Sequence, residues 1–178
     1  MKAEDVIHFW FKELSREEWF KKDPAIDRTV KNKFEKTLLQ ASRGELFFWR
    51  KTSLGRLAEI IVLDQFSRNI YRNDARAFSH DVMALTLAQE MVAQKLDQDL
   101  PPYMRSFVYM PYMHSESHVI HQEAIKLFSG PKLEFNLKFE REHKKIIDLF
   151  GRYPHRNKIL KRKSTPEEKI FIKGHPGF

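Results

Sequence analysis

Apolar residues recur at spacings of three and four along nearly all of this 178-residue sequence, and no stretch alternates between apolar and polar residues for long. This spacing is typical of amphipathic helices, whose buried stripe repeats every 3.6 residues. We therefore predict an all-α fold of about eight helices with no sheet. Because the connections are short, neighbouring helices should pack as antiparallel hairpins.

Capping signals and helix breakers set the predicted boundaries. Asp23 before Pro24 marks a helix start, and Ser15 with Glu18 forms a capping box. The expected helices cover residues 4–14, 24–44, 53–69, 77–96, 103–109, 115–128 and 134–150, with short helices opening at Ser15 and Thr165. The segment 53–69 is apolar on several faces, which predicts a central helix covered on all sides.

The composition limits the class of protein. With 42% hydrophobic residues and 15 Phe, residues 1–178 can bury one substantial core, and we predict a single domain. No run of apolar residues reaches the roughly 18 to 20 needed to cross a bilayer, and no signal peptide is recognisable, so we expect a cytoplasmic protein without a membrane partner. The absence of cysteine excludes disulfides and thiolate metal ligands.

The net charge of +8 is concentrated at the C-terminal end. Residues 1–150 carry 24 Lys and Arg against 22 Asp and Glu, whereas residues 151–178 carry 8 against 2. This basic C-terminal segment suits phosphates or acidic partners, but it also reads as a solvated, solubilising end. Because no nucleic-acid-binding motif accompanies it, the sequence does not favour polynucleotide binding.

The first group of candidate site residues interrupts the most apolar helix with polar side chains, and it comprises Asp64, Gln65, Arg68, Asn69 and Arg72. The spacing of four places Asp64 over Arg68 and Arg68 over Arg72. Two guanidinium groups can hold a carboxylate or phosphate, so Arg68 and Arg72 form a candidate anion clamp. The alternative is an internal ion pair between Asp64 and Arg68 that only fixes the helix.

The second group is His114, Glu116, His118 and His121. On one helix, three imidazoles at this spacing are a possible zinc site, but the His-Glu-x-x-His pattern is absent and no fourth ligand is evident, so we expect no metal. His118 and His121 then face solvent. A second interpretation makes His114 a general base oriented by Glu116, which requires His114 to precede the helix because residues two apart do not face each other.

The third group follows a predicted helix end at Gly151 and consists of His155, Arg156 and Asn157. Their side chains are hydrogen-bond donors that can contact an anion near the start of a short helix after Pro154. The alternative is a helix stop followed by a fixed turn.

Three strings in this order resemble a bacterial family of uncharacterised proteins known as DUF924: Leu-Asp-Gln-Phe-Ser-Arg-Asn-Ile-Tyr-Arg (63–72), Pro-Tyr-Met-His-Ser-Glu (111–116) and Gly-Arg-Tyr-Pro-His-Arg-Asn (151–157). The resemblance covers nearly the whole chain. It implies a tetratricopeptide-like all-α fold and no particular activity. Ser67 departs from the proline that the resemblance leads us to expect, which allows the helix to continue toward Tyr71.

Three functional interpretations remain open from the sequence. The first is a helical scaffold whose three groups of polar residues form a pocket for a small anionic ligand or an acidic peptide. The second is a hydrolase with His114 as base and Glu116 as its partner. The third is a purely structural ion-pair network, with a protein-interaction surface elsewhere. No cofactor is expected, because no cofactor-binding loop is legible.

Overall fold

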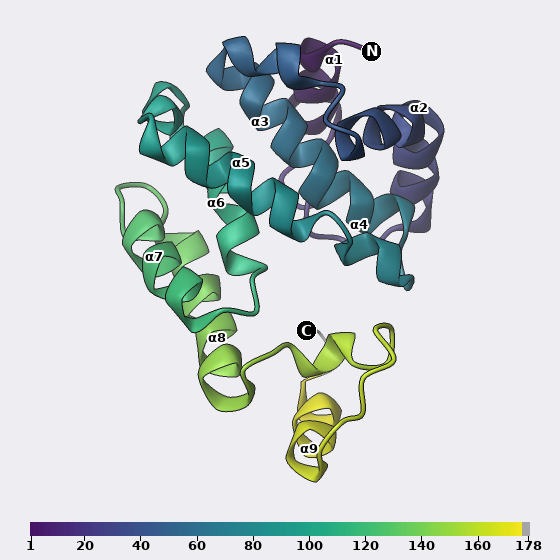
Figure 1. Ribbon diagram of the computed structural model, residues 1–178, viewed down its shortest axis with the longest axis vertical. Coiled ribbons are helices and arrows are strands. Elements are labelled where there is room, and N and C mark those ends of the chain that lie inside the picture. Colours follow the sequence, from purple (N-terminus) through teal and green to yellow (C-terminus); the bar gives the residue numbers. More distant parts are fainter. Residues whose placement is uncertain (176–178) are drawn as a thin grey trace.

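The computed structural model of the protein describes residues 1–175, and within them every regular element is helical (Figure 1). The segments α3 (Ser53–Ile61), η3 (Val62–Phe66) and α4 (Ser67–Ile70) follow one another without a break and form one rod. Counted this way, the described residues contain eight long helices, as the periodicity predicted. Within the same residues, no helix combines the length and the apolar character that crossing a bilayer requires.

The rod of α3, η3 and α4 lies at the centre of the N-terminal half. It packs against α1 (Ala3–His8) and α2 (Pro24–Ser42), and η1 (Phe9–Glu13) continues α1 (Figure 1). The predicted central helix is confirmed, because seven of its apolar side chains are fully covered: Leu57, Ala58, Ile60, Ile61, Val62, Leu63 and Phe66. Edge-on and tilted aromatic contacts from Phe9, Trp10 and Phe34 surround the Phe66 ring.

The second half is a series of helices in which each packs against the next. These are α5 (Asp81–Ala93), α6 (Pro102–Met113), α7 (His118–Phe128) and α8 (Glu134–Phe150), and α6 also contacts α8. Three short helices connect the longer ones: η2 (Phe47–Lys51), η4 (Ala75–Phe78) and η5 (Leu96–Asp99). The helical hairpins agree with the short connections, whereas the likeness to tetratricopeptide repeats stays a prediction.

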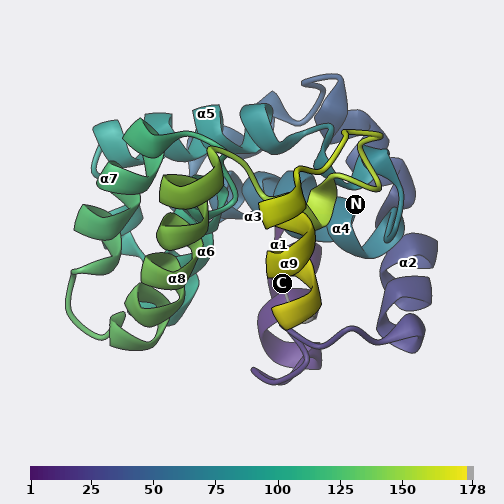
Figure 2. The same cartoon turned by 90° about the horizontal axis from the view of Figure 1, so that it is seen from below.

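The C-terminal segment leaves α8 at Gly151, whose φ of 66° gives the left-handed cap expected there. It then runs through η6 (Pro154–Arg156) to α9 (Pro166–Gly174). Figures 1 and 2 show this segment crossing from α8 toward the end of the central rod. The crossing brings the third predicted group of site residues close to the first.

The predicted helix at Ser15, the predicted break at Pro111 and the bounds of the predicted helix 77–96 were wrong, since α5 covers only Asp81–Ala93. The capping box at Ser15 forms, with Ser15 N 2.7 Å from a Glu18 carboxylate oxygen, but only a turn follows it. Trp19 holds this turn in place by donating its indole N–H to the Trp10 carbonyl. Asp23 is extended and caps α2, so only a few residues lie between the capping box and the next helix. In α6, the helix continues through Pro111, although proline was expected to interrupt it. The ring costs one backbone hydrogen bond, and tight packing around this buried helix outweighs that loss.

Candidate functional site

Asp64 is the acid of the first predicted group, and its side chain is only 1% exposed. It lies in η3, where one π-helical turn interrupts the central rod. Its carboxylate accepts hydrogen bonds from Gln65 Nε2 at 2.6 Å and from His114 Nδ1 at 2.7 Å, and Arg68 Nη1 lies at 3.2 Å. The predicted ion pair between Asp64 and Arg68 is therefore present, but it belongs to a larger network.

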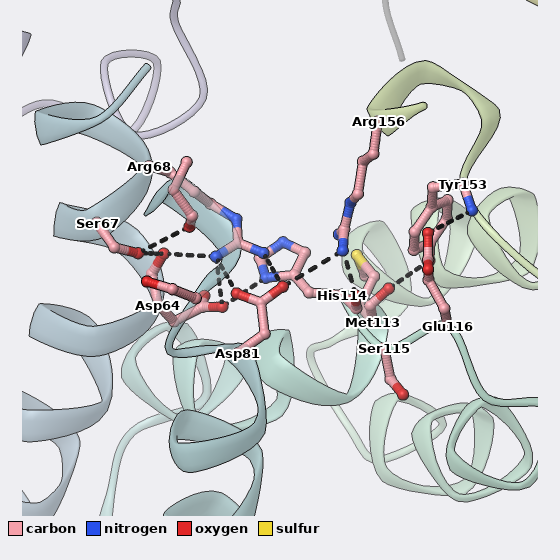
Figure 3. Close-up of polar contacts among 12 residues, drawn as sticks. Asp64, Ser67, Arg68, Asp81, Met113, His114, Ser115, Glu116, Tyr153 and Arg156 are labelled. Atoms are coloured by element: carbon pink, nitrogen blue, oxygen red, sulfur yellow. Dashed lines mark hydrogen bonds and ion pairs between the residues drawn. The ribbon is translucent and has the colours of Figure 1, made fainter. Parts of the chain in front are cut away.

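Arg68 joins two acids rather than one (Figure 3). It donates two hydrogen bonds to Asp81 at 2.8 and 3.0 Å, and a third to the Asp64 backbone carbonyl. Asp81 begins α5, so this bidentate pair ties the end of the central rod to the next helix. Arg156 approaches Asp81 from the other side at 3.3 Å and donates to the His114 carbonyl at 3.0 Å.

His114 ends α6 and faces Asp64 from fifty residues further along the chain. Burial raises the pKa of Asp64, but the charge of Arg68 and the hydrogen bonds from His114 and Gln65 outweigh it and hold the carboxyl well below its usual range. Burial and the charge of Arg68 lower the pKa of His114, although the negative charge of Asp64 acts to raise it. At neutral pH, Nδ1 therefore carries the hydrogen that Asp64 accepts, and Nε2 is unprotonated. Within residues 1–175, Nε2 has no hydrogen-bond partner.

Arg72 and Asn69 form hydrogen bonds to a different acid, Asp27. Asp27, on α2, accepts two hydrogen bonds from Arg72 and one from Asn69 Nδ2 at 2.8 Å. Arg72 therefore does not share an anion with Arg68 in this structure, although both side chains line the same cavity. The Nη1 group of Arg72 donates no hydrogen bond to any described residue, and the side chain is 30% exposed.

The proposed pairing of His114 with Glu116 is not what the structure shows. Glu116 instead accepts two hydrogen bonds from Arg162, at 2.6 and 2.9 Å, and one from the Tyr153 amide. The physical reason is topological, because the C-terminal segment brings a guanidinium to Glu116 while Asp64 occupies the imidazole of His114. Asn157 is fully buried beside this pair and accepts from Arg162 Nε.

Three arginines of the basic C-terminal segment are paired with acids within the molecule. Besides Arg162 with Glu116, Arg152 forms a bidentate pair with Glu168, and Arg156 reaches Asp81. The contacts of Arg162 and Arg156 fasten the segment to the loop after α6 and to α5, whereas the pair of Arg152 with Glu168 lies within the segment. The three arginines therefore do not form an open patch for phosphates.

The three histidines of the second group point to different partners. His114 contacts Asp64, His118 is exposed near Asp148, and His121 is fully buried against Glu140 at 2.7 Å. The expectation that His121 faces solvent was wrong, because its face of α7 packs on α8. Among residues 1–175, no three His, Asp or Glu side chains are placed to hold a metal ion.

A cavity of about 540 Å³ lies where the three predicted groups converge, and we name it the cationic pocket. Four basic residues and three histidines contribute to its walls, and no Asp or Glu does. The complete lining is Lys22, Arg68, Arg72, Asn73, Ala77, Phe78, His114, Phe139, His143, Tyr153, His155, Arg156 and Ile159.

The pocket combines charge with aromatic surface. The Arg156 guanidinium carbon lies 4.6 Å from the centre of the Phe78 ring and 4.7 Å from that of Tyr153. Burial lowers the pKa of His143 to about 4 and that of His155 to about 3. Both imidazoles are therefore neutral at physiological pH, and the four basic side chains supply the positive charge of the walls.

Sequence reasoning missed several residues that build this site. Lys22, Phe78 and Tyr153 belong to none of the candidate groups, and Asp27 and Asp81, which hold the arginines, are not recognisable as their partners. His143 also belongs to none of the candidate groups, because a lone histidine that shares a helix face with apolar residues is typical of a core residue. The one available signal was Asp81, near the start of the predicted helix 77–96, and a favourable helix dipole explains an acid there equally well.

Comparison with known proteins identifies the family of the chain and a solved structure with a similar fold. A family model described as "Bacterial protein of unknown function (DUF924)" matches residues 6–176. The chain belongs to this family. It also resembles the solved structure of the protein of unknown function ATU0120 from Agrobacterium tumefaciens, with a TM-score of 0.90, 35% sequence identity and 97% of each chain covered. No curated protein matches the chain.

The substitution Asp64→Asn tests the network at its most buried point. Arg68 and His114 lose the negative charge between them, and only Asp81 remains for Arg68, so the free energy of unfolding should fall by about 2 to 3 kcal/mol in urea denaturation. Asp74→Asn is the matched control, because Asp74 forms an exposed pair with Arg76. Equal stability of both variants would show that the buried network does not stabilise the fold.

The two pocket histidines predict a stability loss in acid. Their pKa values lie below the ordinary value of about 6.5, so below that pH the unfolded chain binds protons that the folded protein excludes. The melting temperature should fall as the pH drops from about 6.5 toward 4. The double variant His143→Gln, His155→Gln should flatten this slope, and exposed His8→Gln should not. An unchanged slope in the double variant would assign the acid loss to other groups.

Proposed function

We propose that this protein binds a small anionic molecule in the cationic pocket. The observation that carries the proposal is the sign of the walls, which present Lys22, Arg68, Arg72 and Arg156 and no carboxylate. A concave site with one sign of charge and apolar walls concentrates counter-ions of the opposite sign. A carboxylate or phosphate is the corresponding ligand group.

The acids that pair with these cations lie outside the walls of the pocket. Asp27 and Asp64 do not line the pocket, and Asp81 borders a neighbouring cavity of about 330 Å³ rather than this one. Each acid fixes the direction of an arginine without filling the space in front of it. Because these carboxylates already hold the arginines in place, less binding free energy is lost to side-chain ordering when a ligand binds.

Donors remain for a ligand after the internal pairs are counted. The Nη1 group of Arg72 and the ammonium group of Lys22 have no hydrogen-bond partner among residues 1–175. Lys22 lies in the loop before α2 and lines the pocket together with residues of the C-terminal segment. Phe78 and Tyr153 offer ring faces for an apolar or aromatic part of the ligand.

The exposed position of Lys22 gives a test of anion binding that leaves the fold intact. We expect hexanoate and phenylphosphate to bind in isothermal titration calorimetry, and hexylamine not to bind. Lys22→Ala should weaken anion binding several-fold, because it removes an unpaired charge from the wall, whereas Lys21→Ala should have no effect because Lys21 pairs with Asp23 outside the pocket. Binding that is equal for anions and hexylamine would contradict the proposal.

Acid–base catalysis by His114 is a second candidate function. The observation that favours it is the bond from Nδ1 to Asp64, which leaves Nε2 unprotonated on a residue that lines the pocket. Asp64 thereby takes the orienting role that the sequence had suggested for Glu116. No Ser or Thr lines the pocket, so a hydrolase of this kind would activate water.

The substitution His114→Gln tests this second candidate. If a panel of carboxylate and phosphate esters reveals hydrolysis, the variant should slow it by about a hundredfold or more, the usual contribution of a general base. His118→Gln is the control, because His118 is exposed and lies outside the pocket. Wild-type rates in the His114 variant would exclude this residue as the base.

A further inference from the structure

The cationic pocket does not end at His114. A second cavity of about 290 Å³ shares His114, Phe139 and His143 with it, and a third of about 600 Å³ shares Phe20, Phe135 and Asn136 with the second. Because successive cavities have wall residues in common, they adjoin one another in a row that leads away from the cationic pocket. We call the second and third cavities together the aromatic groove.

One face of α6 forms the floor of the aromatic groove. Tyr103, Phe107, Met110 and His114 follow one another at spacings of four, three and four, which places them on one side of the helix. At about 1.5 Å per residue, the eleven steps from Tyr103 to His114 span about 16 Å. The floor is thus a continuous strip with an imidazole at its pocket end.

Aromatic side chains from two other segments form the walls. Phe135 and Phe139 come from α8, which lies beside α6 (Figure 2), and Trp19 and Phe20 come from the turn after η1. Phe20 is 55% exposed and Phe135 64% exposed. Exposed aromatic rings facing one groove are apolar surface that a bound molecule would remove from water.

We propose that the ligand of the cationic pocket is a free long-chain fatty acid, whose carboxylate lies among the basic residues and whose chain follows the aromatic groove. This inference rests on the proposed function, because the head group uses the same cations. Charge complementarity fixes the orientation of the chain. The cavity at the outer end carries Glu17 besides Arg16 and Lys132, whereas the cationic pocket has no acid in its walls.

A hydrocarbon chain suits this groove better than a peptide does. An extended peptide presents a backbone N–H and C=O at each residue, and each needs a partner when it leaves water. The part of the groove next to the cationic pocket offers one amide side chain, Asn136, besides its two histidines. A methylene chain needs no partners and gains from every ring that it covers.

The test is a chain-length series in isothermal titration calorimetry with hexanoate, decanoate and tetradecanoate, each below the concentration at which it forms micelles. Affinity should rise about tenfold or more from hexanoate to decanoate, because each added methylene leaves water for the groove. Dodecyltrimethylammonium, which has a similar tail and a positive head, should not bind.

Variants separate the groove from the pocket. The double substitution Phe20→Ser, Phe135→Ser should weaken decanoate binding at least fivefold and leave hexanoate binding unchanged. Both rings are largely exposed, so the fold should tolerate the change. Phe47→Ser is the matched control, since Phe47 is 66% exposed and lies outside the groove.

Each contrary outcome has a defined meaning. Equal affinity for hexanoate and decanoate would overturn the fatty-acid inference and leave the anion pocket standing, whereas no binding of any anion would overturn both. Equal binding of the cationic amphiphile would show non-specific apolar association. Tighter binding of a hydrophobic tetrapeptide with a free carboxylate than of decanoate would assign the groove to a protein partner instead.

Discussion

The buried carboxylate of Asp64 is the interaction on which the site depends. A charge that is 1% exposed is destabilising unless partners replace the lost water, and Arg68, Gln65 and His114 do so here. These partners come from the central rod and from the end of α6. Satisfying one buried acid therefore fixes the relative positions of two parts of the fold and the tautomer of the imidazole between them.

The same constraint explains why the pocket is positive. Arg68 is held by acids on its far side, Arg72 is held by Asp27, and Arg156 reaches Asp81 while it stacks on Phe78. The carboxylates face the interior of the network and the guanidinium groups border the cavity. Electrostatic balance and ligand attraction are thus properties of one arrangement, so a structural role for the network and a binding role for the pocket are compatible.

Local patterns in the sequence were sufficient for the helices and for one contact of the site. The pair of Asp64 and Arg68 follows from a spacing of four on a helix, and Gly151 ends α8 as expected. The partners that decide the chemistry were not accessible in this way. His114 meets Asp64 across fifty residues and Arg72 meets Asp27 across forty-five, so both contacts depend on tertiary packing. His114 and Glu116 were suggested as a pair because they lie two residues apart. The sequence did not indicate that the C-terminal segment returns and pairs Arg162 with Glu116.

The most direct measurement of anion binding is a crystal structure of the protein soaked with 4-bromobenzoate, with bromine located by anomalous scattering. We expect one dominant bromine peak inside the cationic pocket, with the carboxylate within hydrogen-bond distance of Arg72 or Lys22 and the ring against Phe78 or Tyr153. Bromine peaks confined to other surfaces, with the pocket containing only water, would contradict the assignment of this cavity as an anion-binding site.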